Sequence, residues 1–232
     1  MRKTEVSAQY STMAAGSFAD RVAAKMRRVM FDRFLAEGVS PTDTLLDVGV
    51  TSDDELEASN YLEAWYPYKD KITACGIDDA SFLERRYPGV RYVHADGRSL
   101  PFGDGEYDVV HSSAVLEHVG SREQQKAFIC ELARTARKFA FLTTPNRWFP
   151  VEFHTVLPLL HWLPPRTFRS IIRRMGHDVL SREENLNLLG ARDIHQLCRE
   201  AGLRDYTVRS VYLGGWPSNL LLTIRNEGNG AS

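Results

Sequence analysis

Hydrophobic positions in this chain follow two spacings. Short apolar runs alternate with longer segments in which apolar residues recur at helical spacing, so the pattern predicts strands that alternate with helices. Such alternation is typical of a parallel sheet whose strands are joined by right-handed crossovers. The first predicted strand begins at Leu45, and the others span residues 72–77, 90–95, 107–111, 139–143, 206–212 and 219–224.

Predicted helices fill most of the segments between these strands. Capping and stop signals set their ends: Ser17 can cap the first helix, and Gly38 and Gly202 follow the first and the last. Residues 214–218 between the last two strands are few enough for an antiparallel pair. The segment 144–189 is expected to be an irregular insertion. The predicted helices span residues 17–37, 52 or 53 to just before Pro67, 80–86, 123–137 and 192–201.

Length and composition favour one domain over residues 1–232. The 232 residues are 43% hydrophobic and 25% charged, enough for one sizeable core. Within it we expect an N-terminal helical segment (residues 1–40) and a substrate-covering lid (residues 147–190). A net charge of -1 argues against a general nucleic-acid binder, because such proteins need a positive excess. The sequence specifies no oligomeric state.

Cysteine usage and the N-terminus indicate a cytoplasmic protein. Cys75, Cys130 and Cys198 are odd in number and far apart, which fits buried thiols in a reducing compartment. Residues 1–10 contain no apolar run of the kind found in signal peptides. The most apolar stretch, residues 151–163, is too short and too often interrupted by polar residues to cross a bilayer.

Two strand ends carry the chemistry expected of a nucleoside site. The run Leu-Leu-Asp-Val-Gly ends at Gly49, and Gly-Ile-Asp ends the next strand at Asp78. A carboxylate at the second position can accept hydrogen bonds from both ribose hydroxyls, which predicts an adenosine-containing cofactor.

Further motifs follow in a fixed order. They are Ala-Asp-Gly at 95–97, Leu-Pro-Phe at 100–102, Tyr-Asp-Val-Val at 107–110, Val-Leu-Glu-His-Val at 115–119 and Thr-Pro-Asn at 144–146. The ordered set resembles the class I S-adenosylmethionine-dependent methyltransferases, in particular the small-molecule branch of the type 11 kind. This resemblance implies an α/β Rossmann-like fold with a seven-stranded, mostly parallel sheet of order 3-2-1-4-5-7-6. Strand 7 would be antiparallel, helices would cover both faces, and the lid insertion would follow strand 5.

The resemblance also implies a cofactor site for S-adenosyl-L-methionine, with S-adenosyl-L-homocysteine as the product. Asp78 would bind the ribose, Asp96 the adenine amino group and the Gly97 backbone the neighbouring ring nitrogen. Asp47 and Gly49 would lie beneath the methionine part, and residues 113 and 114 would line the sulfonium region. The implied cofactor-binding residues are Asp47, Gly49, Val50, Thr51, Asp78, Asp79, Asp96, Gly97, Ser113 and Ala114.

The turn after Gly49 departs from the family pattern. Val50 and Thr51 stand where further glycines are usual, and acidic residues crowd the segment 53–57. These acids would repel a pyrophosphate at a helix start, which opposes a dinucleotide oxidoreductase. The carboxylate of the cofactor would need donors such as Thr51, Ser52 or Tyr10. A second hypothesis follows: a degenerate cofactor-binding protein that acts through a partner.

Catalysis of methyl transfer depends mainly on positioning the acceptor in line and excluding water. A hydroxyl acceptor would also benefit from a base. The candidates are His118 after the fourth strand and Glu152 and His154 after the fifth. A structural role, in which such a histidine only orders its loop, remains open for each. We expect no metal, because Glu152 and His154 alone are a weak ligand set.

The segment 149–176 should determine the acceptor. It combines an apolar wall with four arginines at helical spacing, Arg166, Arg169, Arg173 and Arg174. We predict a small-molecule acceptor, methylated on a hydroxyl oxygen, with nitrogen and carbon left open. One hypothesis is a lipophilic, lipid-linked or phosphorylated acceptor with the arginines at an anionic membrane surface; the alternative is a solvated basic helix face. Residues 144–146 lack the motif of enzymes that methylate nucleobase amino groups.

Overall fold

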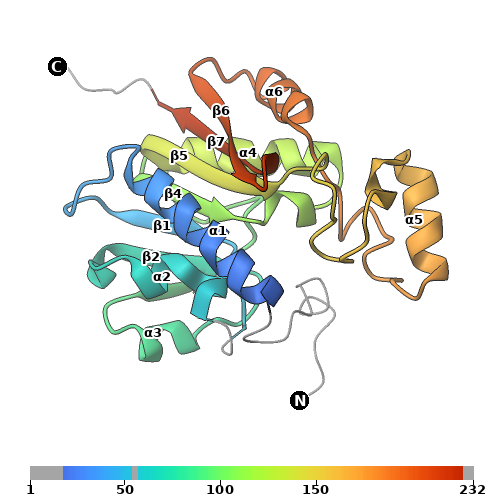
Figure 1. Ribbon diagram of the computed structural model, residues 1–232. Helices are drawn as coiled ribbons and strands as arrows, with labels where there is room; N and C mark the ends of the chain where they lie inside the picture. The colour runs from blue at the N-terminus through green and yellow to red at the C-terminus, as the bar shows by residue number, and fades with distance from the viewer. Residues whose placement is uncertain (1–17, 54–56, 227–232) are drawn as a thin grey trace.

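A seven-stranded sheet forms the centre of the molecule (Figure 1). The computed structural model describes residues 18–53 and 57–226. The strand order is β3-β2-β1-β4-β5-β7-β6, and all neighbours are parallel except that β7 is antiparallel to both β5 and β6. This topology confirms the order implied by the sequence motifs. The strands are β1 (Leu45–Val48), β2 (Ile72–Gly76), β3 (Arg91–His94), β4 (Tyr107–Ser113), β5 (Ala136–Pro145), β6 (Tyr206–Leu213) and β7 (Trp216–Arg225).

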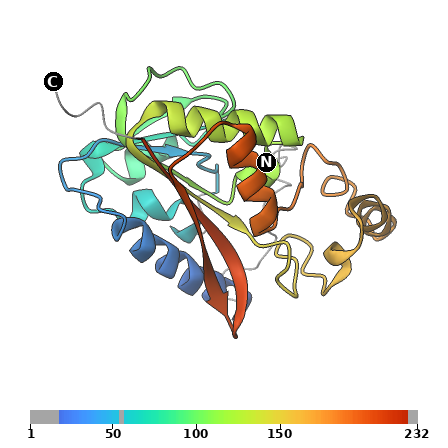
Figure 2. The ribbon, with the colours of Figure 1, turned by 90° about the horizontal axis from the view of Figure 1, so that it is seen from above.

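Helices cover both faces of the sheet, as Figure 2 shows from above. One core cluster joins α1 and α2 to one face, and a second joins α4 and α6 to the other. The helix α5 lies beside the sheet rather than on it (Figure 1). The α-helices are α1 (Phe18–Leu35), α2 (Tyr61–Trp65), α3 (Phe82–Arg86), α4 (Arg122–Thr135), α5 (Pro165–Arg174) and α6 (Ala191–Glu200). Short 3-10 helices span Glu57–Asn60, Lys69–Lys71, Leu116–His118 and Leu160–Trp162.

Central strands bury side chains on both faces, which explains their continuous apolar runs. On β5, Phe139 and Phe141 pack in the cluster that contains α1, whereas Ala140 and Leu142 pack in the cluster that contains α4. Successive side chains of a strand point to opposite faces, so both sets are buried by helices.

The helix expected from residue 52 or 53 to Pro67 was predicted wrongly. The structure has the 3-10 helix Glu57–Asn60 followed by α2, and residues 51–53 form a loop. The Asn60 side chain explains this difference, because it accepts a hydrogen bond from Thr51 N (2.9 Å) and donates one to Thr51 O (3.0 Å). A side chain that bonds locally to the backbone competes with helix formation.

The insertion, residues 147–190, is more ordered than the irregular segment expected. It contains α5, and the side chains of Phe168, Ile172, Leu180 and Leu186 form a small core of their own. The other deviations are shifts of element ends. β5 begins earlier and ends later than predicted because it pairs with β7 from Phe139 to Pro145 and with β4 from Ala136.

The order of the strands places a crevice at one edge of the sheet. β1 lies between β2 and β4, so the chain leaves β1 on one side and returns to β4 on the other. Ligands of open α/β sheets bind at such a switch point, beyond the carboxyl ends of the strands. Gly49 follows β1 and Ala114 follows β4 at this point.

Candidate active site

A pocket of about 190 Å³ lies at the carboxyl ends of β1, β2 and β4. Of the predicted cofactor residues, Gly49, Val50, Asp96, Gly97 and Ala114 line it. The catalytic candidate His118 also lines it, together with apolar side chains such as those of Ile77 and Phe128. The switch point of the sheet and the sequence motifs therefore converge on one pocket.

Two glycines in the pocket wall are required by its geometry. Gly49 has φ +99°, and a Cβ at this position would lie 2.2 Å from Val115 Cγ2. A Cβ on Gly97 would lie 2.4 Å from the Phe128 ring. Both positions demand the absence of a side chain, the first also because left-handed φ values are strained for other residues. Ala114 carries such strain, with φ 55°.

The turn after Gly49 directs its backbone donors inward. Gly49 N and Val50 N both donate to Cys75 O, at 2.7 and 3.1 Å, and Thr51 N donates to the Asn60 side chain. A pyrophosphate site needs free N–H groups at such a turn. These three are engaged within the protein, which argues further against a dinucleotide. The Thr51 N–H also serves Asn60 rather than a cofactor carboxylate, and Tyr10 lies outside the described residues.

Asp47 forms a buried hydrogen-bonded chain on the α1 side of the sheet. His111 Nδ1 donates to Asp47 Oδ1 (2.7 Å), and the Tyr61 hydroxyl donates to His111 Nε2 (2.9 Å), since His111 then has its lone pair on that nitrogen. Burial raises the pKa of Tyr61 and keeps its proton in place. Asp47 and Ser113 line a small cavity that shares Gly49 and Val50 with the main pocket.

Sequence reasoning missed the neighbours of Asp47. His111 lies opposite Asp47 in the parallel pairing of β1 and β4, a register that the sequence does not show. Glu63 on α2 is fully buried, and burial, followed by the charge of Asp47, raises the pKa of its carboxyl. A neutral carboxyl is therefore buried beside the Asp47 end of the pocket.

The remaining acids divide into two groups. Asp96 lies at the pocket edge, where Arg98 donates to it through Nε (3.0 Å) and Nη2 (2.6 Å), and this bond lowers the pKa of its carboxyl. Asp78 is buried, and its carbonyl accepts a hydrogen bond from the Tyr92 hydroxyl. Asp79 accepts from Ser81 N in a turn. Within residues 18–53 and 57–226, neither Asp78 nor Asp79 contributes to the pocket lining.

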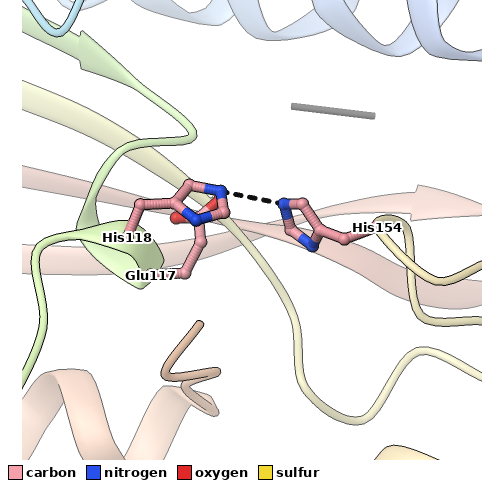
Figure 3. Close-up of side chains that lie close together, drawn as sticks. All are labelled: Glu117, His118 and His154. Atoms are coloured by element: carbon pink, nitrogen blue, oxygen red, sulfur yellow. Dashed lines mark hydrogen bonds and ion pairs between the residues drawn. The ribbon is translucent and has the colours of Figure 1, made fainter. Parts of the chain in front are cut away.

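The three catalytic candidates lie in one hydrogen-bonded row. His154 Nε2 lies 3.0 Å from His118 Nε2 (Figure 3), and His154 Nδ1 lies 2.6 Å from Glu152 Oε1. His118 Nδ1 lies 2.7 Å from the Asn185 carbonyl oxygen. Residues from the ends of β4 and β5 and from the far part of the insertion thus meet beside the pocket.

The acceptor groups fix the protons of this row. A carbonyl only accepts, so His118 Nδ1 donates to Asn185 and leaves its lone pair on Nε2. His154 then donates from both nitrogens, to His118 and to Glu152. Burial, aided by His154, lowers the pKa of His118 to about 3. Burial opposes the charged form of His154, but Glu152 outweighs it and raises the pKa of this imidazole.

Glu152 organises the loop that carries His154. Its carboxylate accepts hydrogen bonds from His154 N (2.9 Å), Thr155 N (2.6 Å) and Thr155 Oγ1 (2.7 Å). Burial would raise the pKa of Glu152, but these donors and the His154 side chain lower it to about 2. Among the described residues it does not line the pocket. Its geometry is that of a group that orients His154.

Glu117, adjacent to His118 in the sequence, completes this corner. Its side chain is fully buried, Thr144 Oγ1 donates to Oε2 (2.9 Å), and Oε1 lies 3.9 Å from His118 Nε2. Burial raises the pKa of this carboxyl. The sequence offered a signal for Glu117 in the Leu-Glu-His motif, but neither its burial nor its direction.

Comparison with known proteins agrees with this fold and site. Residues 58–142 match the family model described as a methyltransferase domain. The chain carries a methyltransferase domain. The match begins after the turn at Gly49, so the departure from the family pattern lies outside it.

Relatives of this methyltransferase domain are distant in sequence. A demethylmenaquinone methyltransferase of Shouchella clausii (strain KSM-K16) is 23% identical over 148 residues, 64% of this chain and 62% of that protein. The chain thus matches less than two thirds of this relative's length. A methyltransferase of Thermotoga maritima, titled a possible histamine N-methyltransferase, superposes with a TM-score of 0.58 at 14% identity, covering 90% of this chain and 92% of that one. Magnesium protoporphyrin IX methyltransferase from Synechocystis PCC 6803, crystallised with SAH, gives 0.57 at 15% identity, covering 92% and 90%.

The pocket of this methyltransferase domain suits an adenosyl sulfonium. Its walls are largely apolar, Asp96 lies at its edge, and the Asp47 carboxylate lies in the adjoining cavity. Carboxylates favour a cation, whereas the donors that would hold a pyrophosphate are engaged by Cys75. The residues present therefore fit S-adenosylmethionine. No described helix is both long and apolar enough to cross a membrane.

Proposed function

We propose that the protein transfers the methyl group of S-adenosylmethionine to a hydroxyl oxygen of a lipophilic small molecule. The observation that carries this proposal is the row Glu152–His154–His118, which reaches the wall of the cofactor pocket through His118. A row that can orient a hydroxyl group is of most use when the acceptor atom bears a proton.

Cofactor binding is assigned to the pocket lining. The bound cofactor supplies an electrophilic methyl group on a positively charged sulfur. Gly49 and Gly97 let the backbone approach it closely, and Asp96 holds its adenosine end. Ala114, strained at the end of β4, and His118 line the same pocket. Rigid placement of the acceptor against these residues supplies most of the rate enhancement expected for an in-line transfer.

We assign the proton of the acceptor to the row rather than to His118 alone. With a pKa of about 3, His118 is a weak base, but its Nε2 lone pair can accept a hydrogen bond from the acceptor hydroxyl. Glu152, ionised and hydrogen-bonded to His154, supplies the negative charge of the row. Glu152 and His154 therefore act as positioning residues and His118 as the group that touches the acceptor.

The insertion supports a lipophilic acceptor. Large apolar side chains are exposed on it and on the adjacent β6–β7 hairpin, among them Trp148 (51%), Leu159 (49%) and Trp216 (50%). The two relatives named above act, by their names, on demethylmenaquinone and on magnesium protoporphyrin IX, which supports a small-molecule acceptor. A cytoplasmic location remains part of this proposal.

Peripheral contact with an anionic membrane is a weaker part of the proposal. Arg169 pairs with Glu183 at 3.1 Å and Arg173 with Asp178 at 3.7 Å, so acidic neighbours offset part of the basic face of α5. Sedimentation with anionic vesicles tests it: the doubly charge-reversed variant Arg166→Glu/Arg174→Glu should bind less than the wild type. Equal binding, or none by the wild type, excludes the membrane contact.

The test of the proposed function separates binding from transfer. Calorimetry should detect binding of S-adenosylhomocysteine, and labelled S-adenosylmethionine with cell extract should yield a labelled small molecule. His118→Asn should lower turnover by roughly 100-fold or more and change cofactor affinity little. His195→Asn on α6 is the matched control and should retain activity. Binding without any transfer would favour the alternative, a degenerate cofactor-binding protein that acts through a partner.

A further inference from the structure

The corner formed by Glu117, His118 and His154 has the chemistry of a metal site. One ligand atom from each residue, an oxygen of Glu117 and Nε2 of each imidazole, lies within 4.8 Å of the others (Figure 3). From these contacts we propose that the protein binds one divalent first-row transition ion, such as Zn²⁺ or Co²⁺, through Glu117, His118 and His154. Two histidines and one carboxylate are a common ligand set for such ions.

The outward hydrogen bonds of the imidazoles are the first support. His118 Nδ1 donates to the Asn185 carbonyl (2.7 Å), and His154 Nδ1 donates to the Glu152 carboxylate (2.6 Å). Histidines that bind metals almost always use their other nitrogen in this way, which fixes the tautomer and the ring direction. Here both rings are fixed so that their Nε2 atoms face the same point, 3.0 Å apart.

The spacing of the ligand atoms is the second support. Ligands about 2.1 Å from a shared ion lie roughly 3.0 to 3.5 Å from each other in tetrahedral or octahedral geometry. The two Nε2 atoms already meet this distance. Glu117 Oε1, 3.9 Å from His118 Nε2, needs to move by an amount on the order of 1 Å to join them.

The orphan oxygen of Glu117 is the third and independent support. The Glu117 side chain is fully buried, Oε2 accepts from Thr144, and no described residue donates to Oε1. A buried carboxylate oxygen without a donor is costly unless something satisfies it. A cation between this oxygen and the two imidazoles would do so.

Metal binding would exchange a proton for the ion. In the metal-free protein the proton on His154 Nε2 bridges the two imidazoles. The ion would bind to both Nε2 lone pairs and release this proton to solvent. Three protein ligands leave coordination positions open, as in catalytic rather than structural sites. Since His118 lines the cofactor pocket, an acceptor hydroxyl could bind there and lose its proton more easily, a consequence that rests on the proposed function.

Cobalt titration of the full chain, without cofactor or acceptor, tests the site by itself. We expect one equivalent of Co²⁺ to bind with visible absorption, and calorimetry with Zn²⁺ in two buffers of different ionisation enthalpy to report proton release. Glu152→Gln should weaken binding by roughly 10- to 100-fold, because it removes the charged partner of His154. His177→Asn, a histidine of the insertion outside this corner, is the matched control and should bind like the wild type.

Two ligand variants keep the test decisive. His154→Asn should lose the stoichiometric equivalent, and Glu117→Gln, which retains an oxygen for Thr144, should lose most of the affinity. Thermal unfolding without metal checks that each variant folds, and the rise of the melting temperature with Zn²⁺ should vanish in both. Absence of binding to the wild type, or undiminished binding to both variants, would show that the imidazoles share only a proton. Either result leaves the methyl-transfer proposal standing.

Discussion

Replacement of Gly49 by alanine should destabilise the protein more than a matched replacement elsewhere. Gly49 has φ +99°, and an added Cβ would lie 2.2, 3.0 and 3.1 Å from the two γ-methyl groups and the Cβ of Val115. Rotation of Val115 cannot relieve this clash because its Cβ is involved as well. The turn itself is held by the bond from Gly49 N to Cys75 O (2.7 Å). Gly38, with φ +103° and no atom within 4 Å of an added Cβ, offers the control.

The magnitude follows from the terms that the two variants share and do not share. A left-handed φ costs a residue with a side chain about 1 to 2 kcal/mol, and the lower entropy of the unfolded alanine chain returns about 0.4 to 1 kcal/mol. Both terms apply to Gly38→Ala and to Gly49→Ala. Overpacking adds about 1 to 3 kcal/mol to Gly49→Ala alone. The difference between the two variants should therefore be about 1 to 3 kcal/mol.

Urea denaturation of the wild type and both variants measures this difference. With an ordinary dependence on urea for a chain of this length, the midpoint of Gly49→Ala should lie roughly 0.5 to 1 M below that of Gly38→Ala. Cofactor affinity should fall in Gly49→Ala as well, because Val115 lines the same pocket. Equal midpoints for the two variants would refute the reasoning, since they would show that the turn can move away from Val115 at no cost.

Two further predictions concern acid stability and the insertion. Burial opposes the ionised form of Asp108, but hydrogen bonds from Thr44 N and Oγ1 (3.0 and 3.1 Å) lower its pKa, so its stabilisation is present above about pH 4 and is lost as the pH falls through the folded pKa. Asp108→Asn should therefore be less stable than the wild type at pH 7 by urea denaturation, and a gap that persists unchanged at pH 3 would contradict this. Ile172→Ala, at a fully buried position, should cost about 2 to 5 kcal/mol within the small core of the insertion and speed its proteolysis without altering cofactor affinity; cleavage at the wild-type rate would contradict this.

Periodicity predicted the sheet better than it predicted the segments around it. Central strands such as β4 and β5 bury side chains on both faces, so their apolar runs are long and unmistakable. The helix predicted after Gly49 failed because a single side chain, that of Asn60, bonds to the Thr51 backbone. Propensity does not register such a contact, since it depends on where the two residues are placed relative to each other.

The candidate site divides in the same way. The cofactor pocket could be predicted because its residues follow strand ends, and parallel strands bring their carboxyl ends to one edge of a sheet. His111 could not, because its contact with Asp47 depends on the register of β1 and β4. Asp78 shows the opposite case, since its strand end matches the motif but its side chain does not line the described pocket.

By itself, the sequence determined the alternation of strands and helices, the place of the methyltransferase motifs and thus the edge of the sheet where a cofactor binds, because these depend on the order of residues along the chain. Only the tertiary structure decided that His118, His154 and Glu117 meet, with Asn185 and Glu152 behind them. These side chains come from three segments far apart in the sequence. Their approach depends on how the insertion packs against the end of β4, and the direction of each imidazole depends on a hydrogen bond that no local pattern encodes.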